Sequence, residues 1–81
     1  MKLSKVQKEL LSRVCFSYHY LQTIETKIPR EKFGEYVCYD GREAKTCMAL
    51  VRAGCFTFSS NGSYHVTGLG LAWYATDKGG N

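Results

Sequence analysis

The sequence predicts a small α+β domain that is mainly helical and carries one β-hairpin. Two stretches place apolar residues at three- and four-residue steps between helix-capping signals, which is typical of amphipathic helices. A third stretch alternates apolar and polar residues around an Asn-Gly pair, which is typical of a hairpin. With 81 residues, the chain can build one small core and no more. We therefore expect residues 1–81 to form a single domain.

The first element is a long helix, predicted at about residues 4–22. Ser4 and Gln7 form the S-x-x-Q pattern of a capping box at its start. Its buried stripe is expected to comprise Leu3, Val6, Leu10, Val14, Tyr18, Leu21 and Ile24, with Leu11 beside them. Phe16 and Tyr20 instead lie one turn apart on the polar side. This pair indicates either a subunit interface, which would make the chain a homodimer, or a surface that the carboxy-terminal segment covers.

A brief strand and a short second helix are predicted next. Residues 24–28 alternate and are β-branched, which favours an edge strand. Pro29 suits the first position of a helix at about residues 29–37, because its missing amide costs nothing there. Gly34 weakens this helix, so only about two turns are expected. The short connection to the next helix predicts a helix-turn-helix.

The third helix, predicted at about residues 41–53, organises the rest of the fold. Asp40 and Glu43 form a capping-box pattern at its start, and Gly54 supplies the positive φ that commonly ends a helix. Its apolar face comprises Ala44, Cys47, Leu50 and Val51. Its opposite face comprises Arg42, Lys45, Thr46 and Ala49. We expect the apolar face to anchor the core and the opposite face to meet a partner.

A hairpin is predicted at about residues 55–67. A two-residue turn at Asn61-Gly62 would mix polar and apolar residues on both faces. A three-residue loop with Gly62 left-handed gives one apolar and one polar face, so we predict this register. It pairs Phe58 with Tyr64, Phe56 with Val66 and Thr57 with His65.

The last helix is predicted at about residues 68–77. Thr67 is its expected cap. Leu69 and Trp73 form an i, i+4 pair, and burial of the Trp73 ring is expected to hold this helix against the rest of the fold.

Charge and cysteine content restrict the class of protein. The net charge is +4, and the surplus of cations precedes Phe33, which is compatible with a nucleic-acid partner. No apolar run reaches the ~20 residues of a membrane span, and no signal-peptide core is visible, so we expect a cytoplasmic protein. The cysteines have no metal-site spacing and are expected to be reduced and mostly buried. No catalytic group with an orienting partner is visible, so no enzyme activity, cofactor or metal is predicted.

Two segments resemble the winged helix-turn-helix family, and the resemblance extends over nearly the whole chain. Leu50-Val51-Arg52-Ala53-Gly54-Cys55-Phe56 looks like the end of the family's recognition helix, a leucine and a glycine before two apolar strand residues. Tyr64-His65-Val66-Thr67-Gly68-Leu69-Gly70 looks like its tyrosine-x-apolar-threonine-x-x-glycine passage from wing to last helix. The order of elements predicted above, helix, strand, helix, helix, hairpin, helix, is also similar to that of a winged helix.

This resemblance implies a small transcriptional regulator that binds duplex DNA with the 41–53 helix in the major groove. The implied contacts from this helix and its margin are Arg42, Lys45, Thr46, Ala49 and Arg52. The second helix would add Arg30 and Lys32, and the hairpin would add Ser60, Asn61 and Ser63. The hairpin carries no formal charge, however, and would release few counterions. This departure supports an alternative, a winged-helix module that binds another protein as an adaptor or inhibitor and does not bind DNA.

Overall fold

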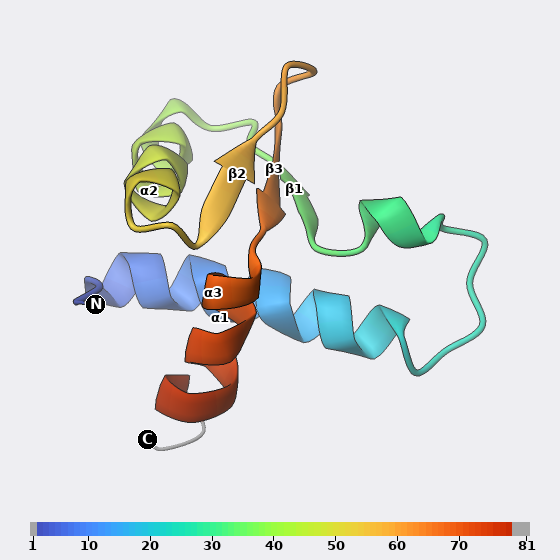
Figure 1. Ribbon diagram of the computed structural model, residues 1–81. Coiled ribbons are helices and arrows are strands. Elements are labelled where there is room, and N and C mark those ends of the chain that lie inside the picture. Colours follow the sequence, from blue (N-terminus) through green and yellow to red (C-terminus); the bar gives the residue numbers. More distant parts are fainter. Residues whose placement is uncertain (1, 79–81) are drawn as a thin grey trace.

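Within residues 2–78, which the computed structural model describes, three helices and a three-stranded antiparallel sheet form an α+β domain (Figure 1). Met1 and residues 79–81 of the predicted domain lie outside the described residues. The elements are α1 (Lys5–Leu21), the 3-10 turn η1 (Arg30–Lys32), β1 (Glu35–Val37), α2 (Gly41–Arg52), β2 (Phe56–Phe58), β3 (Ser63–Val66), α3 (Gly68–Trp73) and the π-helical turn η2 (Tyr74–Lys78). The predicted α+β class is confirmed.

The long helix α1 begins directly after its predicted cap. The Ser4 hydroxyl accepts from the Gln7 amide at 3.2 Å, and the Gln7 side chain accepts from the Ser4 amide at 2.9 Å, which completes the capping box. The predicted stripe is only partly right, because Val6 is 61% exposed and Ile24 is also exposed. The elements that cover α1 pack on the side of Leu11 and leave Val6 uncovered.

Residues 24–37 differ from the prediction. The segment 24–28 forms bends and irregular structure instead of a strand, and the helix expected at 29–37 is reduced to the single turn η1. The strand is β1, which pairs with β3 and thereby occupies the sheet edge. The predicted helix-turn-helix is therefore wrong, since α2 follows β1 after a short connection.

Gly34 is the physical reason for this difference. Its φ is +81°, and a Cβ at this position would lie 2.7 Å from Val66 Cγ1 and 3.1 Å from Tyr18 Cδ2. Its carbonyl accepts from the Val66 amide at 3.0 Å. Glycine here lets the chain turn sharply into the sheet and approach it closely, which a helical residue could not do.

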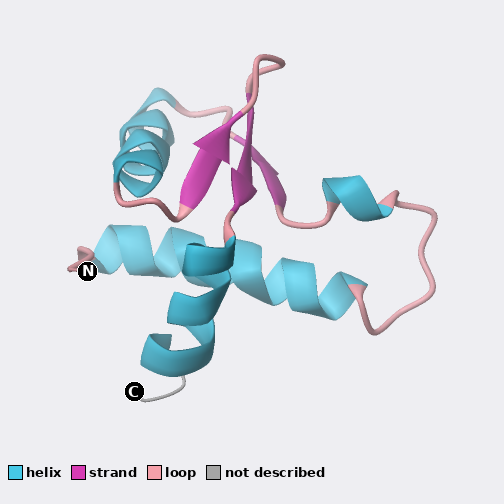
Figure 2. Cartoon of the chain, viewed as in Figure 1, coloured by secondary structure: helices cyan, strands magenta, loops and turns pink. Residues whose placement is uncertain are grey.

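The sheet has the strand order β1-β3-β2 and stands between α2 and η1 in the view of Figure 2. The hairpin register predicted from the alternating pattern is confirmed: Phe56 pairs with Val66, Thr57 with His65 and Phe58 with Tyr64. Gly62 has a φ of +91°, as the three-residue loop requires. This register places Phe56 and Tyr64 in the core, while Phe58 on the same face remains 55% exposed.

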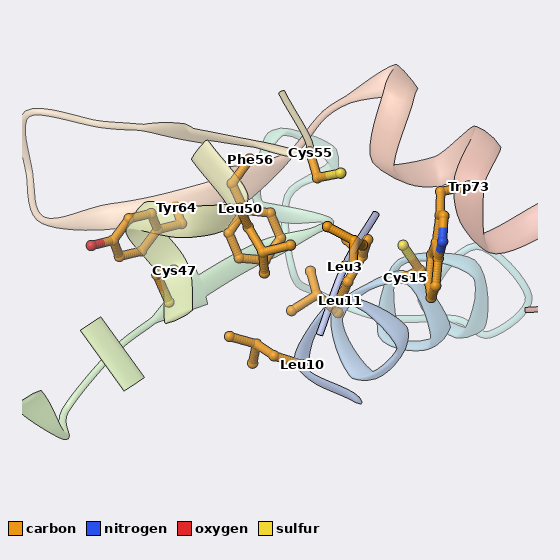
Figure 3. Packing of buried hydrophobic residues seen from close by; sticks show 11 residues of the cluster. Leu3, Leu10, Leu11, Cys15, Cys47, Leu50, Cys55, Phe56, Tyr64 and Trp73 are labelled. Atoms are coloured by element: carbon orange, nitrogen blue, oxygen red, sulfur yellow. The ribbon is translucent and has the colours of Figure 1, made fainter. Parts of the chain in front are cut away.

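The core lies where α1, α2 and the sheet meet (Figure 3). The predicted apolar face of α2 is confirmed, because Cys47 and Leu50 are fully buried and Ala44 and Val51 are half-buried. The other members of the core are Leu3, Leu10, Leu11, Val14, Cys15, Cys55, Phe56, Tyr64 and Trp73. None of the helices within residues 2–78 combines the length and apolar character that a membrane crossing needs.

The carboxy-terminal helix packs on the core through Trp73, as predicted, and not through Leu69. Thr67 caps α3 by accepting from the Gly70 amide at 3.2 Å. Trp73 is buried, but Leu69 is 52% exposed and does not join it in the core. The reason is that α3 turns its Gly70 side toward α1, where the Cys15 thiol donates to the Gly70 carbonyl at 3.6 Å.

None of the four cysteines, all of which lie within the described residues, forms a disulfide, as expected, and three of them are buried. Burial raises the pKa of Cys15 and of Cys47 to about 12. Both side chains therefore remain protonated at neutral pH and act as small apolar groups in the core.

Candidate nucleic-acid interface

The outer surface of α2 is an exposed basic face, which we call the α2 face. Its members are Arg42, Lys45, Met48, Ala49 and Arg52. They share one side of the helix because they are spaced three, four and seven residues apart. All are exposed except Ala49, which is half-buried. Three cations therefore stand on one face of a twelve-residue helix, about 18 Å long.

Asp40 fixes the start of α2 and also borders the α2 face. Its Oδ1 accepts from the Arg42 amide at 2.9 Å, while its carbonyl accepts from the Cys38 thiol at 3.0 Å. The same Oδ1 lies 4.0 Å from Arg42 Nε. The Arg42 side chain is 95% exposed, so this ion pair is weak and leaves the guanidinium free to engage another anion.

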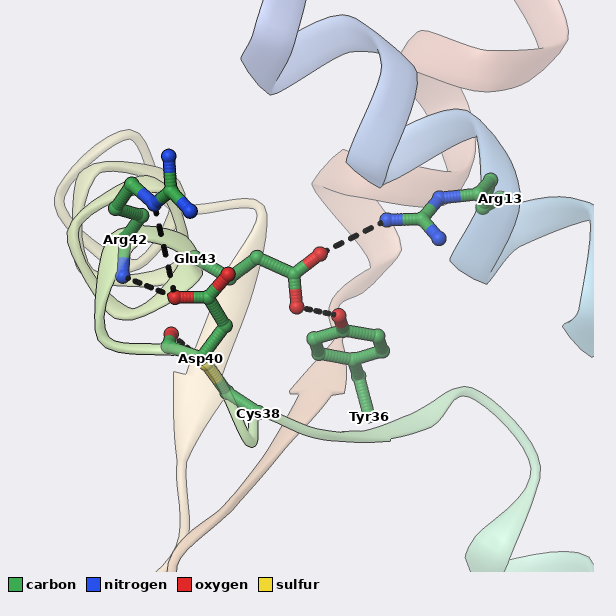
Figure 4. A network of polar contacts seen from close by, with 6 residues as sticks. All are labelled: Arg13, Tyr36, Cys38, Asp40, Arg42 and Glu43. Carbon is green, nitrogen blue, oxygen red and sulfur yellow. Dashed lines mark hydrogen bonds and ion pairs between the residues drawn. The ribbon is translucent and has the colours of Figure 1, made fainter.

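Glu43 does not complete the predicted capping box. Its carboxylate turns away from the α2 face and joins a network that links α1, β1 and α2 (Figure 4). Arg13 Nη2 donates to Glu43 Oε2 at 3.3 Å, and the Tyr36 hydroxyl donates to Glu43 Oε1. Two donors from outside the helix thus attract Glu43 more strongly than the single Asp40 amide.

This network has two consequences for the candidate interface. Burial, the hydrogen bond to Glu43 and the charge of Glu43 raise the pKa of Tyr36 to about 12, so its hydroxyl remains a donor at neutral pH. The carboxylate of Glu43 is held by Arg13 and Tyr36 and adds no negative charge to the α2 face. Sequence spacing alone cannot predict this arrangement, because Tyr36 and Arg13 are separated from Glu43 by 7 and 30 residues along the chain.

The other predicted contact residues are divided among different surfaces. Thr46 is half-buried and lies in a groove between α1 and α2 instead of on the α2 face. Arg30 and Lys32 are exposed on η1, which Figure 1 shows on the opposite side of the sheet from α2. Arg42, Lys45, Ala49 and Arg52 are thus brought together, and Arg30 and Lys32 are not.

The hairpin tip offers fewer polar groups than predicted. Ser60 and Asn61 are exposed, but Ser63 is only 3% exposed. The Ser63 hydroxyl and amide both donate to Asn61 Oδ1, at 2.7 and 3.1 Å. Ser63 is therefore turned into the hairpin, where the Asn61 side chain satisfies its hydroxyl, and it offers less to a partner than Ser60 and Asn61 do.

The groove between α1 and α2 has a volume of about 680 Å³. Its walls mix apolar and charged side chains, among them Val6, Glu9, Arg13, Glu43 and Thr46. Within residues 2–78, no group of three or more histidine, cysteine, aspartate or glutamate side chains is arranged to hold a metal ion.

Comparison with known proteins gave no match for this chain. No family model, no curated protein sequence and no solved structure matches it. The geometry of the α2 face is therefore the basis for a functional assignment.

Proposed function

We propose that the chain is a small transcriptional regulator that binds duplex DNA with the α2 face in the major groove. The observation that carries this proposal is the set of three cations, Arg42, Lys45 and Arg52, on one exposed helical face without an acidic member. A major groove about 12 Å wide admits an α-helix. The weak Asp40 ion pair and the diverted Glu43 carboxylate both favour an anionic partner at this face.

Each member of the face has a distinct role in this proposal. Arg42 stands near the amino end of the helix and would bond the edge of a guanine in two places. Lys45 and Arg52 would contact phosphates, and Ala49 would meet a thymine methyl group. Ser60 at the hairpin tip would add a hydrogen bond to the backbone.

The proposal keeps only part of the resemblance to the winged helix-turn-helix family. The segments that carry the resemblance form the end of α2, the hairpin and the start of α3. The second helix is replaced by β1. In the proposed mode of binding, β1 and the Glu43 network therefore hold α2 in place of a helix-turn-helix partner.

Replacing Arg42 and Lys45 together with alanine should weaken binding to a short DNA duplex by at least about tenfold, or about 1.4 kcal/mol, at fixed moderate salt. Loss of two phosphate or base contacts should also reduce the slope of log affinity against log salt by about 2. Fluorescence anisotropy with a labelled duplex, selected from random sequence, measures both quantities. The matched control is Arg30→Ala with Lys32→Ala, which removes the same charge from η1. Equal losses in the two double variants would contradict the assignment to α2.

Asp40→Asn should strengthen DNA binding. Asparagine caps a helix about as well as aspartate, so the free energy of unfolding should change by less than about 1 kcal/mol. The substitution removes the negative charge beside Arg42, and affinity for the duplex should rise by about threefold at low salt. Glu31→Gln on η1 is the matched control and should have a smaller effect. A folded Asp40→Asn variant with unchanged affinity would contradict the proposed contact of Arg42 with DNA.

A second candidate function is a protein-binding module without DNA affinity, such as an adaptor or inhibitor. Two observations favour it: the hairpin from Phe56 to Thr67 has no formal charge, and Tyr39, two residues before α2, is 93% exposed. Exposed aromatic side chains are enriched at protein interfaces. Absence of retention of the wild type on DNA at low salt, together with stoichiometric recovery of one protein, would favour this alternative.

A further inference from the structure

The exposed side of α1 carries a regular seam that the core does not use. Its members are Val6, Glu9, Arg13, Phe16 and Tyr20, at alternating steps of three and four residues. This spacing is the seam of a two-helix coiled coil, in which side chains at alternating steps of three and four face a second helix. The buried residues of α1 (Leu10, Leu11, Val14 and Cys15) form a separate stripe. The helix therefore has one side for the core and another that remains unpartnered among the described residues.

Three of the five seam residues are exposed hydrophobic side chains. Phe16 is 61% exposed and Tyr20 is 52% exposed, and their rings stack with centroids 6.2 Å apart and planes 11° apart. Val6 is exposed farther along the same side. The alternative expectation, that the carboxy-terminal segment covers the two rings, is not met by the described residues, because η2 stacks Tyr74 on His19 instead.

We propose that two copies of this chain form a homodimer by antiparallel pairing of their α1 helices along this seam. In the register centred between Glu9 and Arg13, Phe16 of one copy lies against Val6 of the second copy. The same register places Glu9 against Arg13 of the second copy. A two-fold axis repeats both contacts, so the interface is self-complementary.

The charges of the seam select the antiparallel direction. Parallel pairing would place Glu9 beside Glu9 and Arg13 beside Arg13, and like charges at such close range are destabilising. Antiparallel pairing places opposite charges together twice. Within the part of the chain that the structure describes, Glu9 makes no ion pair of its own. Arg13 bonds Glu43 through Nη2, and its guanidinium has further donors for a second carboxylate.

The groove beside α1 provides space for the Phe16 side chain of the second copy. It is lined by Val6, Glu9 and Arg13 on the α1 side and by Thr46 on the α2 side. Its volume of about 680 Å³ is ample for an aromatic ring, whose burial would remove apolar surface from water in both copies. Each copy then contributes one groove and one Phe16 ring to the interface. The proposed dimer does not depend on DNA binding.

The proposed pairing is tested by measuring the mass in solution of two charge variants. Each variant is measured alone, and the two are then measured as a mixture. At about 100 µM, the wild type should have twice the mass of one 9.2 kDa chain by sedimentation equilibrium. Glu9→Arg and Arg13→Glu should each be monomeric, because each creates like-charge contacts across the axis. An equimolar mixture should recover the dimer, since the mixed pair again has opposite charges at both contacts. Circular dichroism verifies that each variant is folded.

A second variant keeps the test independent of the Arg13–Glu43 contact. Phe16→Ala should weaken dimerisation by at least about tenfold, while Phe58→Ala, which truncates a comparably exposed phenylalanine on the hairpin, should leave it unchanged. A wild type that is monomeric at about 1 mM would overturn the proposal. So would dimers that survive all three α1 substitutions, or a mixture of folded charge variants that stays monomeric. Duplex binding by Arg42→Ala/Lys45→Ala is measured separately, so the two proposals can fail independently.

Discussion

Leu50→Ala is expected to lower the free energy of unfolding by about 3–4 kcal/mol. Leu50 is fully buried on the inner face of α2 and lies in the core with residues of α1 and the sheet (Figure 3). Removing its side-chain atoms loses their transfer free energy and leaves a cavity that the surrounding helix and sheet cannot fill completely. For a domain of this size, such a loss is a large part of the total stability. The variant should therefore have a much lower urea midpoint than the wild type, with a similar denaturant slope.

Leu69→Ala is the matched control for this prediction, because it makes the same chemical change in another helix at a side chain that is 52% exposed. Its effect should remain below about 1 kcal/mol. Urea titrations followed by the fluorescence of the buried Trp73 report both values. Equal destabilisation by the two substitutions would contradict the position of Leu50 at the centre of the core.

Local chemistry made several elements predictable from the sequence. The caps Ser4, Asp40 and Thr67 act on amides two or three residues away, so their effect does not depend on the rest of the fold. The hairpin register was predictable because only one pairing gathers Phe56, Phe58 and Tyr64 on one face. The apolar face of α2 follows from helical periodicity alone.

Features that depend on distant partners could not be predicted in this way. Glu43 has the spacing of a capping-box residue, yet Arg13 and Tyr36 provide competing donors that only the tertiary structure brings close. Val6 has helical periodicity with the core residues, but no element among residues 2–78 covers it. For the candidate site, the basic outer face of α2 was therefore predictable, while the separation of Arg30 and Lys32 from it was not.

Gly34 is where local propensity and tertiary structure make opposite predictions. In the helix expected at residues 29–37, alanine would be favoured over glycine by about 1 kcal/mol. In the structure, Gly34 has a φ of +81°, and its missing Cβ would lie 2.7 Å from Val66 Cγ1. An alanine at this position would be strained by the positive φ, and its methyl group would also crowd Val66. Gly34→Ala should therefore destabilise the domain by about 2–3 kcal/mol. The sign of the change in the free energy of unfolding thus distinguishes the two conformations.

The control for Gly34→Ala is Gly68→Ala, because a Cβ at Gly68 would meet nothing within 4 Å and the residue opens α3 with an ordinary φ. This control should be neutral or stabilise the domain by up to about 1 kcal/mol, as expected for alanine in a helix. Chemical denaturation of both variants measures the difference. A Gly34→Ala protein as stable as the wild type would mean that residues 29–37 can form the predicted helix. That helix would place a partner before α2 and restore the helix-turn-helix that β1 replaces, so the same measurement tests how α2 is held for its proposed contact with DNA.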